Sequence, residues 1–352
     1  MAYCPCGTRN FDYKKDMAVF RTPFHWGALV ILLGVLFISP AFLHGSIVNL
    51  INEIALISIT VMGLNILTGF CGQISLGQSA FMAVGAYVTA ILATRYNFNF
   101  LIALPCGALG AGIVGVLFGL PSVRIKGFYL AMSTLAAQFI IPALISNPFA
   151  FITNGTNSLR VPAPQLGSLT FNTPQTFFYI VVPIAIIAIY IAKNISRTGI
   201  GRAFIAIRDD DLAADVMGIN TFRYKLLAFF LCTLYAGMAG GLWAYWLRSI
   251  NPDHFMLNNS IQYLAMLIVG GMGSVPGAVF GVSFLLILDH LLREFALQMG
   301  VFFPTWANLF QQASTPLLYG LVIVFFLIFE PRGLAHRWEV MKTTWRLRPF
   351  SY

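Results

Sequence analysis

Long apolar runs separated by short polar segments repeat along most of this chain. Most of these runs approach the ~20 residues that a helix needs to cross the ~30 Å hydrocarbon layer of a bilayer. The pattern therefore predicts a series of membrane-spanning helices. The clear runs are Trp26–His44, Ser46–Thr68, Ala80–Arg95, Leu101–Leu120, Gly127–Asn147, Thr176–Ala192, Leu226–Leu247 and Leu317–Phe329.

One further apolar run is interrupted near its middle. Residues 261–288 read IQYLAMLIVGGMGSVPGAVFGVSFLLIL, and the glycine-rich sequence GGMGSVPG divides them. This run is either one long span or two short ones. If it is two, the chain has ten spans in all.

The basic residues favour the count of ten. Lysine and arginine in short loops mark the cytoplasmic side of a membrane protein. If the N-terminus is cytoplasmic, ten spans place 17 of the 21 Lys and Arg residues inside and four outside. The four outside are Arg95, Arg160, Arg248 and Arg293.

These observations predict an all-α polytopic membrane protein with about ten transmembrane helices, some of them interrupted by glycine. Residues 1–25 are expected to form a cytoplasmic N-terminal tail, and residues 26–330 a transmembrane domain. Within that domain, residues 193–225 are expected to form a cytoplasmic loop. Residues 331–352 are expected to form a cytoplasmic C-terminal tail, so that both termini are cytoplasmic.

The composition agrees with membrane insertion. Of the 352 residues, 58% are apolar and 9% are charged, and the mean hydropathy is +0.80. A soluble domain of this composition would aggregate through its exposed apolar surface. The net charge of +9 therefore describes topology, and it does not favour nucleic-acid binding.

The N-terminal tail and the cysteines exclude some further classes. Residues 1–25 are polar and lack an apolar core followed by a small-residue cleavage site, so we expect a retained tail and not a signal peptide. The scattered cysteines predict neither a metal site nor a disulfide framework. They are Cys4, Cys6, Cys71, Cys106 and Cys232.

The loop at residues 193–225 is a charged segment between apolar runs, with ten of the chain's formal charges. Asp209, Asp210 and Asp211 precede LAADVM, where carboxylates favour the beginning of a helix. Gly218 then suits the end of that helix. A helix of two turns is too short to be stable alone. Its small residues, Ala213 and Ala214, suggest a docking element, and the alternative is a solvated connector.

Two stretches are interrupted by glycine in a similar way: GFCGQISLGQSAFMAVGAYV at 69–88 and VGGMGSVPGAVFG at 269–281. Polar side chains there can bind backbone groups freed where a helix breaks. Two explanations for the glycines are equally good: tight helix packing, or a role in a hinge or in the lining of a passage. The candidate residues are Gly69, Gly72, Gln73, Ser75, Gly77, Gly270, Gly271, Gly273, Ser274 and Gly277.

Charged groups within the spans are scarce. Glu53 is expected near the outer end of the second span and Asp289 near the end of the ninth. An ion-coupled carrier usually keeps ionisable groups near the membrane centre, so their scarcity disfavours that class. The sequence also lacks a G-x-x-x-x-G-K-[ST] motif, so energy from ATP would have to come from another subunit. No catalytic set is recognisable, and an enzyme is not expected.

Four stretches together resemble a known family. They are LNILTGFCGQISLGQSAFMAVGAYVTAIL at 64–92, GRAFIAIRDDDLAADVMGIN at 201–220, IVGGMGSVPGAVFG at 268–281 and FEPRGL at 329–334. They are similar, in matching order, to the permease subunits of branched-chain amino acid ABC importers, and in particular to the longer, LivM-like permease. The resemblance covers roughly residues 46–335.

The resemblance implies an importer in the cell (inner) membrane, in which two related permeases form the pore. Two ATP-binding subunits drive it, and an extracytoplasmic substrate-binding protein delivers a branched-chain amino acid or a related small amino acid or amide. It implies no cofactor on this chain, because the partner subunits use the ATP. Besides the second permease, the ATP-binding subunits and the binding protein, membrane lipid is the only expected partner. The alternative is an autonomous ion-coupled secondary transporter of small polar solutes.

The resemblance also assigns the loop at 201–220 to coupling with the ATPase, in agreement with the helix signals. The candidate coupling residues are Gly201, Arg202, Asp210, Ala213, Ala214, Asp215 and Gly218.

Overall fold

A computed structural model of the protein describes residues 23–123, 129–166, 169–302, 317, 319–326, 328–330 and 333–347. Most of the expected N-terminal tail, with Cys4 and Cys6, lies outside the described residues, as do the basic residues Arg124 and Lys126. The described residues are almost entirely helical, which confirms the predicted all-α class.

The helices follow the apolar runs closely. They are α2 (Pro23–Phe42), α3 (Gly45–Leu64) with its π-helical extension η1 (Asn65–Phe70), α4 (Gln78–Arg95), α5 (Phe100–Val123), α6 (Tyr129–Ser146), α7 (Ala150–Thr153), α8 (Pro174–Ile195), α9 (Gly199–Asp209), α10 (Asp211–Val216), α11 (Thr221–Leu247), the 3₁₀-helix η2 (Pro252–Phe255), α12 (Leu257–Gly270), α13 (Val275–Phe302) and α15 (Gly333–Leu347). The interrupted run at 261–288 is thus two helices, α12 and α13, separated at Gly271–Ser274.

Five of the described helices are long and apolar enough to cross a membrane: Gly45–Phe70, Phe100–Pro121, Pro174–Ile195, Thr221–Leu247 and Val275–Phe295. Shorter apolar helices include Leu33–Phe42 and Leu130–Ser146. The protein is therefore a multi-pass membrane protein, and its total of ten spans stays a prediction.

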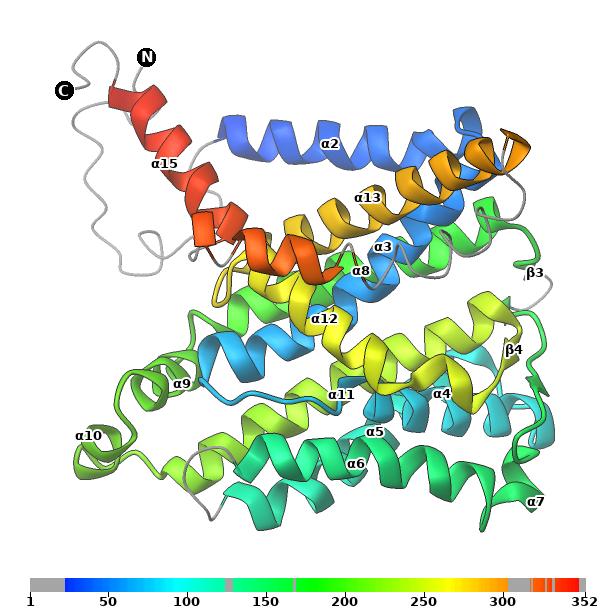
Figure 1. Ribbon diagram of the computed structural model, residues 1–352, viewed down its shortest axis with the longest axis horizontal. Helices are drawn as coiled ribbons and strands as arrows, with labels where there is room; N and C mark the ends of the chain where they lie inside the picture. Colours follow the sequence, from blue (N-terminus) through cyan, green and yellow to red (C-terminus); the bar gives the residue numbers. More distant parts are fainter. Residues whose placement is uncertain are drawn as a thin grey trace.

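The long helices run between two ends of the molecule (Figure 1). At one end, here called the α10 end, lie α9 and α10. At the other, the strand end, lie α7 and the short strands β1 (Leu159–Arg160), β2 (Gln165–Leu166), β3 (Leu169–Thr170) and β4 (Ser249–Ile250). Strand β1 pairs antiparallel with β4, and β2 with β3.

Helix α11 packs against α3, α4 and α5 in the centre of the molecule. Small residues allow this close packing: Gly85 of α4 lies against the backbone of Gly237 of α11, and Gly240 lies against the carbonyl of Met82. Membrane helices associate through small residues in this way, because lipid supplies no hydrophobic driving force between them. Helix α4 is buried on most of its surface, which explains its weak amphipathic pattern.

The C-terminal segment, expected from the sequence to be a tail, contains a helix whose beginning packs on the rest of the molecule. Helix α15 starts against α12 and α13, and its residues from Arg337 to Thr344 are exposed. Its first residue, Gly333, has a φ of +75° and lies against the backbone of Gly270 and Gly271. The conformation available to glycine therefore lets the chain turn closely over the end of α12 before α15 begins.

Candidate functional site

The first glycine-interrupted stretch begins with an irregular helix end. Helix α3 continues as the π-helix η1, whose residues Asn65–Phe70 are all buried. Short π-helical segments occur frequently at functional sites. The chain then leaves helical conformation after Cys71 and resumes it at Gln78. Irregular backbone inside a membrane protein needs polar partners from the protein itself.

Asn65 joins the two glycine-interrupted stretches. Its Nδ2 donates to the carbonyl of Ser274 over 3.2 Å, and its Oδ1 accepts from the N–H of Gly273 over 2.9 Å. One fully buried side-chain amide therefore satisfies two backbone groups in the turn between α12 and α13. The sequence pattern did not single out Asn65. Its signal was an amide side chain near the end of an apolar run.

Arg208 brings a third element, α9, to the same place. Its Nη1 donates to the carbonyl of Gly69 over 3.0 Å, while its Nε and Nη2 bind Oδ1 of Asp209 over 3.2 and 3.1 Å. The loop at 193–225 thus contacts the first break directly. We call the group formed by Asn65, Gly69, Gly72, Arg208, Gly273 and Ser274 the glycine junction. Nothing in the sequence distinguished Arg208 from the other arginines of the loop.

Ser75 and Ser274 bind backbone groups at the breaks, as expected. Ser75 Oγ accepts from the N–H of Gly77 over 3.4 Å, and Ser274 Oγ accepts from the N–H of Gly277 over 3.2 Å. Gln73 differs from the expectation, because its Oε1 is buried and has no hydrogen-bond partner among the described residues. Its backbone makes the contacts instead: its N–H donates to Leu67 and its carbonyl accepts from Thr68.

The other candidate glycines lie outside the junction and in close packing contacts. Gly270 and Gly277 face each other across the turn between α12 and α13, and Gly271 lies beneath Gly333. Gly77 lies against the carbonyl of Thr134 on α6. At these positions the glycines allow close backbone packing, which is the first of the two explanations considered for them.

Side chains from other helices accept hydrogen bonds from the backbone N–H groups at the beginning of α4, and no sequence pattern indicated these contacts. The N–H of Leu76 donates to Thr134 Oγ1 over 3.0 Å, the N–H of Ser79 to Ser260 Oγ over 2.9 Å, and the N–H of Ala80 to Gln138 Oε1 over 3.1 Å. Helix N-termini leave such N–H groups without partners in their own helix. The polar residues of α6 and α12 therefore fix the position of the first break.

The helix signals of the charged loop are confirmed. Asp210 caps α10 by accepting from the N–H groups of Leu212 and Ala213 over 2.9 and 3.1 Å. At the other end, the N–H of Gly218 donates to Asp215 and that of Ile219 to Ala214, the pattern of a Schellman motif. An ion pair of 2.6 Å between Lys225 and Asp211 also ties α10 to α11.

The expected patch of two alanines is divided. Ala213 is exposed, but Ala214 is buried against this chain and does not offer its side chain to a partner. The exposed apolar surface of α10 is formed instead by Leu212, Val216 and Met217, which are 63%, 87% and 82% exposed. Gly201 is buried against Ile195 and Ser196 at the beginning of α9, and the neighbouring Arg202 is exposed.

Asp289 lies in a helix that continues beyond the apolar run. Helix α13 extends to Phe302, so Asp289 is near the middle of the helix, while its position near the end of the span stays a prediction. Its side chain is buried and pairs with Arg293 one turn later over 2.8 Å. The apolar run stopped at Leu288, whereas the helix continues through a polar segment that the run could not include. Glu53 of α3 is within electrostatic range of this pair.

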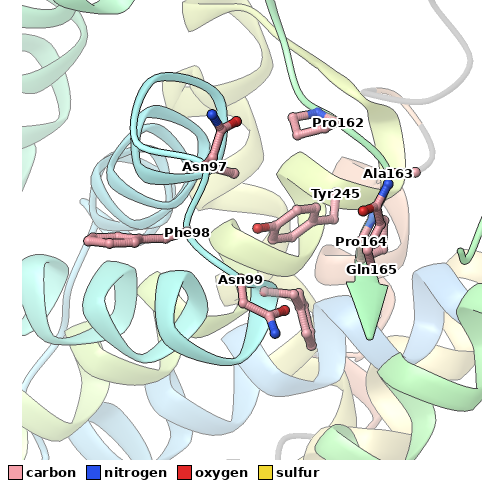
Figure 2. A pocket seen from close by; sticks show the side chains of 10 residues that line it. Asn97, Phe98, Asn99, Pro162, Ala163, Pro164, Gln165 and Tyr245 are labelled. Atoms are coloured by element: carbon pink, nitrogen blue, oxygen red, sulfur yellow. The ribbon is translucent and has the colours of Figure 1, made fainter. Parts of the chain in front are cut away.

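A pocket of about 410 Å³ lies at the strand end (Figure 2). The turn between α4 and α5 and the segment before β2 form its walls, and Tyr245 of α11 points between them. Its lining residues are all neutral: Ala93, Asn97, Phe98, Asn99, Phe100, Pro162, Ala163, Pro164, Gln165 and Tyr245. None of them was a sequence candidate. They offer amide groups and aromatic rings to a ligand, and none of these lining residues is charged.

Comparison with known proteins identifies the family. The model of the family described as branched-chain amino acid transport system / permease component matches residues 46–327. The chain belongs to this permease family. The match spans α3 to α13 and so includes the glycine junction and the charged loop.

This permease is similar to two kinds of relative. It is 29% identical over 330 residues to the high-affinity branched-chain amino acid transport system permease protein LivM of Escherichia coli, with 87% of this chain and 74% of that protein covered. It is 25% identical over 318 residues to the LivH permease protein of the system with the same name in Salmonella typhimurium, covering 84% and 95%.

Among solved structures, it resembles PsaBC from Streptococcus pneumoniae in complex with Fab, with a TM-score of 0.41, 16% identity, and 85% and 97% of the two chains covered. Membership of the permease family makes this chain a multi-pass membrane transport protein and not an enzyme.

Proposed function

We propose that this chain is one of two membrane-spanning permease subunits of an ABC importer for branched-chain amino acids or related small amino acids and amides. The observation that carries the proposal is the family match over residues 46–327. The chain is similar to both LivM and LivH, and both are described as permease proteins of the high-affinity branched-chain amino acid transport system. This similarity supports a pair of related permeases.

The energy source in this proposal is a pair of ATP-binding subunits that dock on α10. A capped helix of six residues presents Leu212, Val216 and Met217 to the surroundings. Exposed apolar patches of this kind mark contact surfaces for other proteins. Helix α10 is too short to be stable alone. Its cap, its Schellman motif and its ion pair with α11 stabilise the helical conformation that a docking subunit would contact.

The proposed location is the cell inner membrane, with α9, α10 and both termini in the cytoplasm. A substrate-binding protein would then deliver its ligand at the strand end. The excess of lysine and arginine in the segments assigned to the cytoplasm supports this orientation.

Reconstitution tests the proposal. The chain is co-purified with its second permease and ATPase subunits, placed in liposomes, and supplied with the binding protein and radiolabelled leucine, isoleucine or valine. Uptake is expected to require ATP and the ATPase subunits, and to persist when ion gradients are collapsed. Uptake by this chain alone, driven by an ion gradient, would instead establish the secondary-transporter alternative.

A further inference from the structure

The carbonyl of Gly69 lies at the end of a helix, where the helix itself supplies no donor. Carbonyl groups in the last turn of a helix lack intrahelical partners and need another source of hydrogen bonds. Here the donor is Arg208, 139 residues further along the chain, at 3.0 Å. A hydrogen bond from a charged donor is among the stronger ones available to a backbone carbonyl.

The Arg208 side chain also occupies the space that two glycines leave open. A Cβ at Gly72 would lie 2.8 Å from Cγ of Arg208, and a Cβ at Gly273 would lie 3.3 Å from its Nη1 and 3.2 Å from the carbonyl of Gly69. Both glycines have a positive φ, +73° and +81°. The arginine therefore contacts the break after α3 directly and is close to the break between α12 and α13.

Arg208 is also close to α10 in the sequence. Only Asp209 and Asp210 separate it from Asp211, the first residue of α10, and Asp210 ends α9 as well as capping α10. A displacement of α10 by a docked subunit would therefore shift the end of α9, and with it the guanidinium. The pairing of Arg208 with Asp209 is largely exposed, so by itself it contributes little to stability. The contact with Gly69 is the one that crosses between elements.

We propose that Arg208 is a positioning residue that transmits movement of α10 to the two helix breaks of the glycine junction. This inference rests on the proposed function, because it needs an ATPase that acts on α10. In the resting protein, the hydrogen bond to Gly69 holds η1 and the turn at Gly273 in one arrangement. Movement of α9 changes or removes that bond, and the irregular segments at 71–77 and 271–274 change conformation with it.

The experiment compares Arg208→Gln and Arg208→Lys with the parent in the reconstituted importer. Arg208→Gln removes the charge and the planar guanidinium group, whereas Arg208→Lys keeps a positive charge without the planar guanidinium geometry. Arg223→Gln is the matched control, since Arg223 is an exposed arginine at the beginning of α11 in the same loop. The quantities measured are assembly, ATP hydrolysis, substrate uptake, and the number of ATP molecules hydrolysed per substrate molecule.

Arg208→Gln is expected to assemble and to hydrolyse ATP within about twofold of the parent, while uptake falls about tenfold, the effect of losing one charge-assisted hydrogen bond. Arg208→Lys should recover part of the uptake, and Arg223→Gln should match the parent. The proposal is overturned if uptake is unchanged, if uptake and ATP hydrolysis fall together, or if neither Arg208 variant assembles. A parent complex that takes up no substrate with ATP would instead refute the proposed function.

Discussion

The N–H of Gly273 donates a hydrogen bond of 2.9 Å to Oδ1 of Asn65, although the two residues are 208 positions apart in the sequence. The same side chain donates to Ser274, so one amide holds the turn between α12 and α13 against the π-helix that ends α3. The two glycine-interrupted stretches, which looked alike in the sequence, are therefore parts of a single structure.

Asn65→Leu should destabilise the permease, because the side chain has a similar size but leaves the buried N–H of Gly273 without its partner, while the Ser274 carbonyl keeps only its bond from Ala278. The expected loss in unfolding free energy is about 1–3 kcal/mol, the cost of one unpaired buried group. Thermal unfolding in detergent measures the effect. Asn49→Leu, about four turns earlier in the same helix, is the control, and an equal loss in both variants would contradict the role of Asn65.

Gly72→Val and Gly273→Val should each reduce transport at least about tenfold, because a left-handed conformation costs an L-residue roughly 1–2 kcal/mol and its Cβ meets Arg208 or Gly69. Uptake assays measure the loss. Gly34→Val is the control, since a Cβ there meets nothing within 4 Å in the part of the chain that the structure describes.

The same two variants separate the explanations for the glycines. If the junction serves tight packing, the variants should lose assembly with the second permease. If it acts as a hinge or lines the passage, the complex should assemble and hydrolyse ATP without moving substrate. Normal assembly together with normal uptake in both variants would show that the breaks do not matter.

Val216→Asp and Met217→Asp should prevent productive docking of the ATPase, because each places a charge on the exposed apolar face of α10. Uptake should fall about tenfold or more, the result of losing about 1.4 kcal/mol of binding energy, while the chain still accumulates in the membrane. Co-purification of the ATPase subunits checks the result, and full recovery of those subunits would contradict it.

Ala214→Arg should behave differently from the α10 surface variants. The alanine is buried against this chain, so an arginine there must displace α10 itself. The expected result is faster proteolysis of the loop at 196–220 in the isolated permease, before any ATPase is added. Protection equal to that of the parent would indicate that α10 tolerates the larger side chain.

Topology can be tested by labelling single cysteines in a cysteine-free background with a reagent that does not cross the membrane. Cysteines at Asn157 and Asn258 should react from outside, since both residues are exposed and lie near β1 and β4 at the strand end. Cysteines at Asp210 and Thr344 should react only after the membrane is opened. Labelling of Thr344 from outside would refute the even number of spans.

The sequence by itself determined the class of protein. Apolar runs of spanning length, the scarcity of charge and the position of the basic residues are local properties, and they are readable without any long-range contact. The cap at Asp210 and the helix end at Gly218 were equally local, because the partners of these residues are at most four positions away.

Only the tertiary structure decided how these parts meet. Arg208 looked like any other charge in a polar loop until its guanidinium was placed on Gly69, and the pairing of Asp289 with Arg293 required α13 to continue past the apolar run. Ala214 turned inward because α10 packs on its own chain. The partners at the junction lie 139 to 209 residues apart in sequence, and no local pattern can specify which distant carbonyl or N–H a side chain will satisfy once the helices are packed.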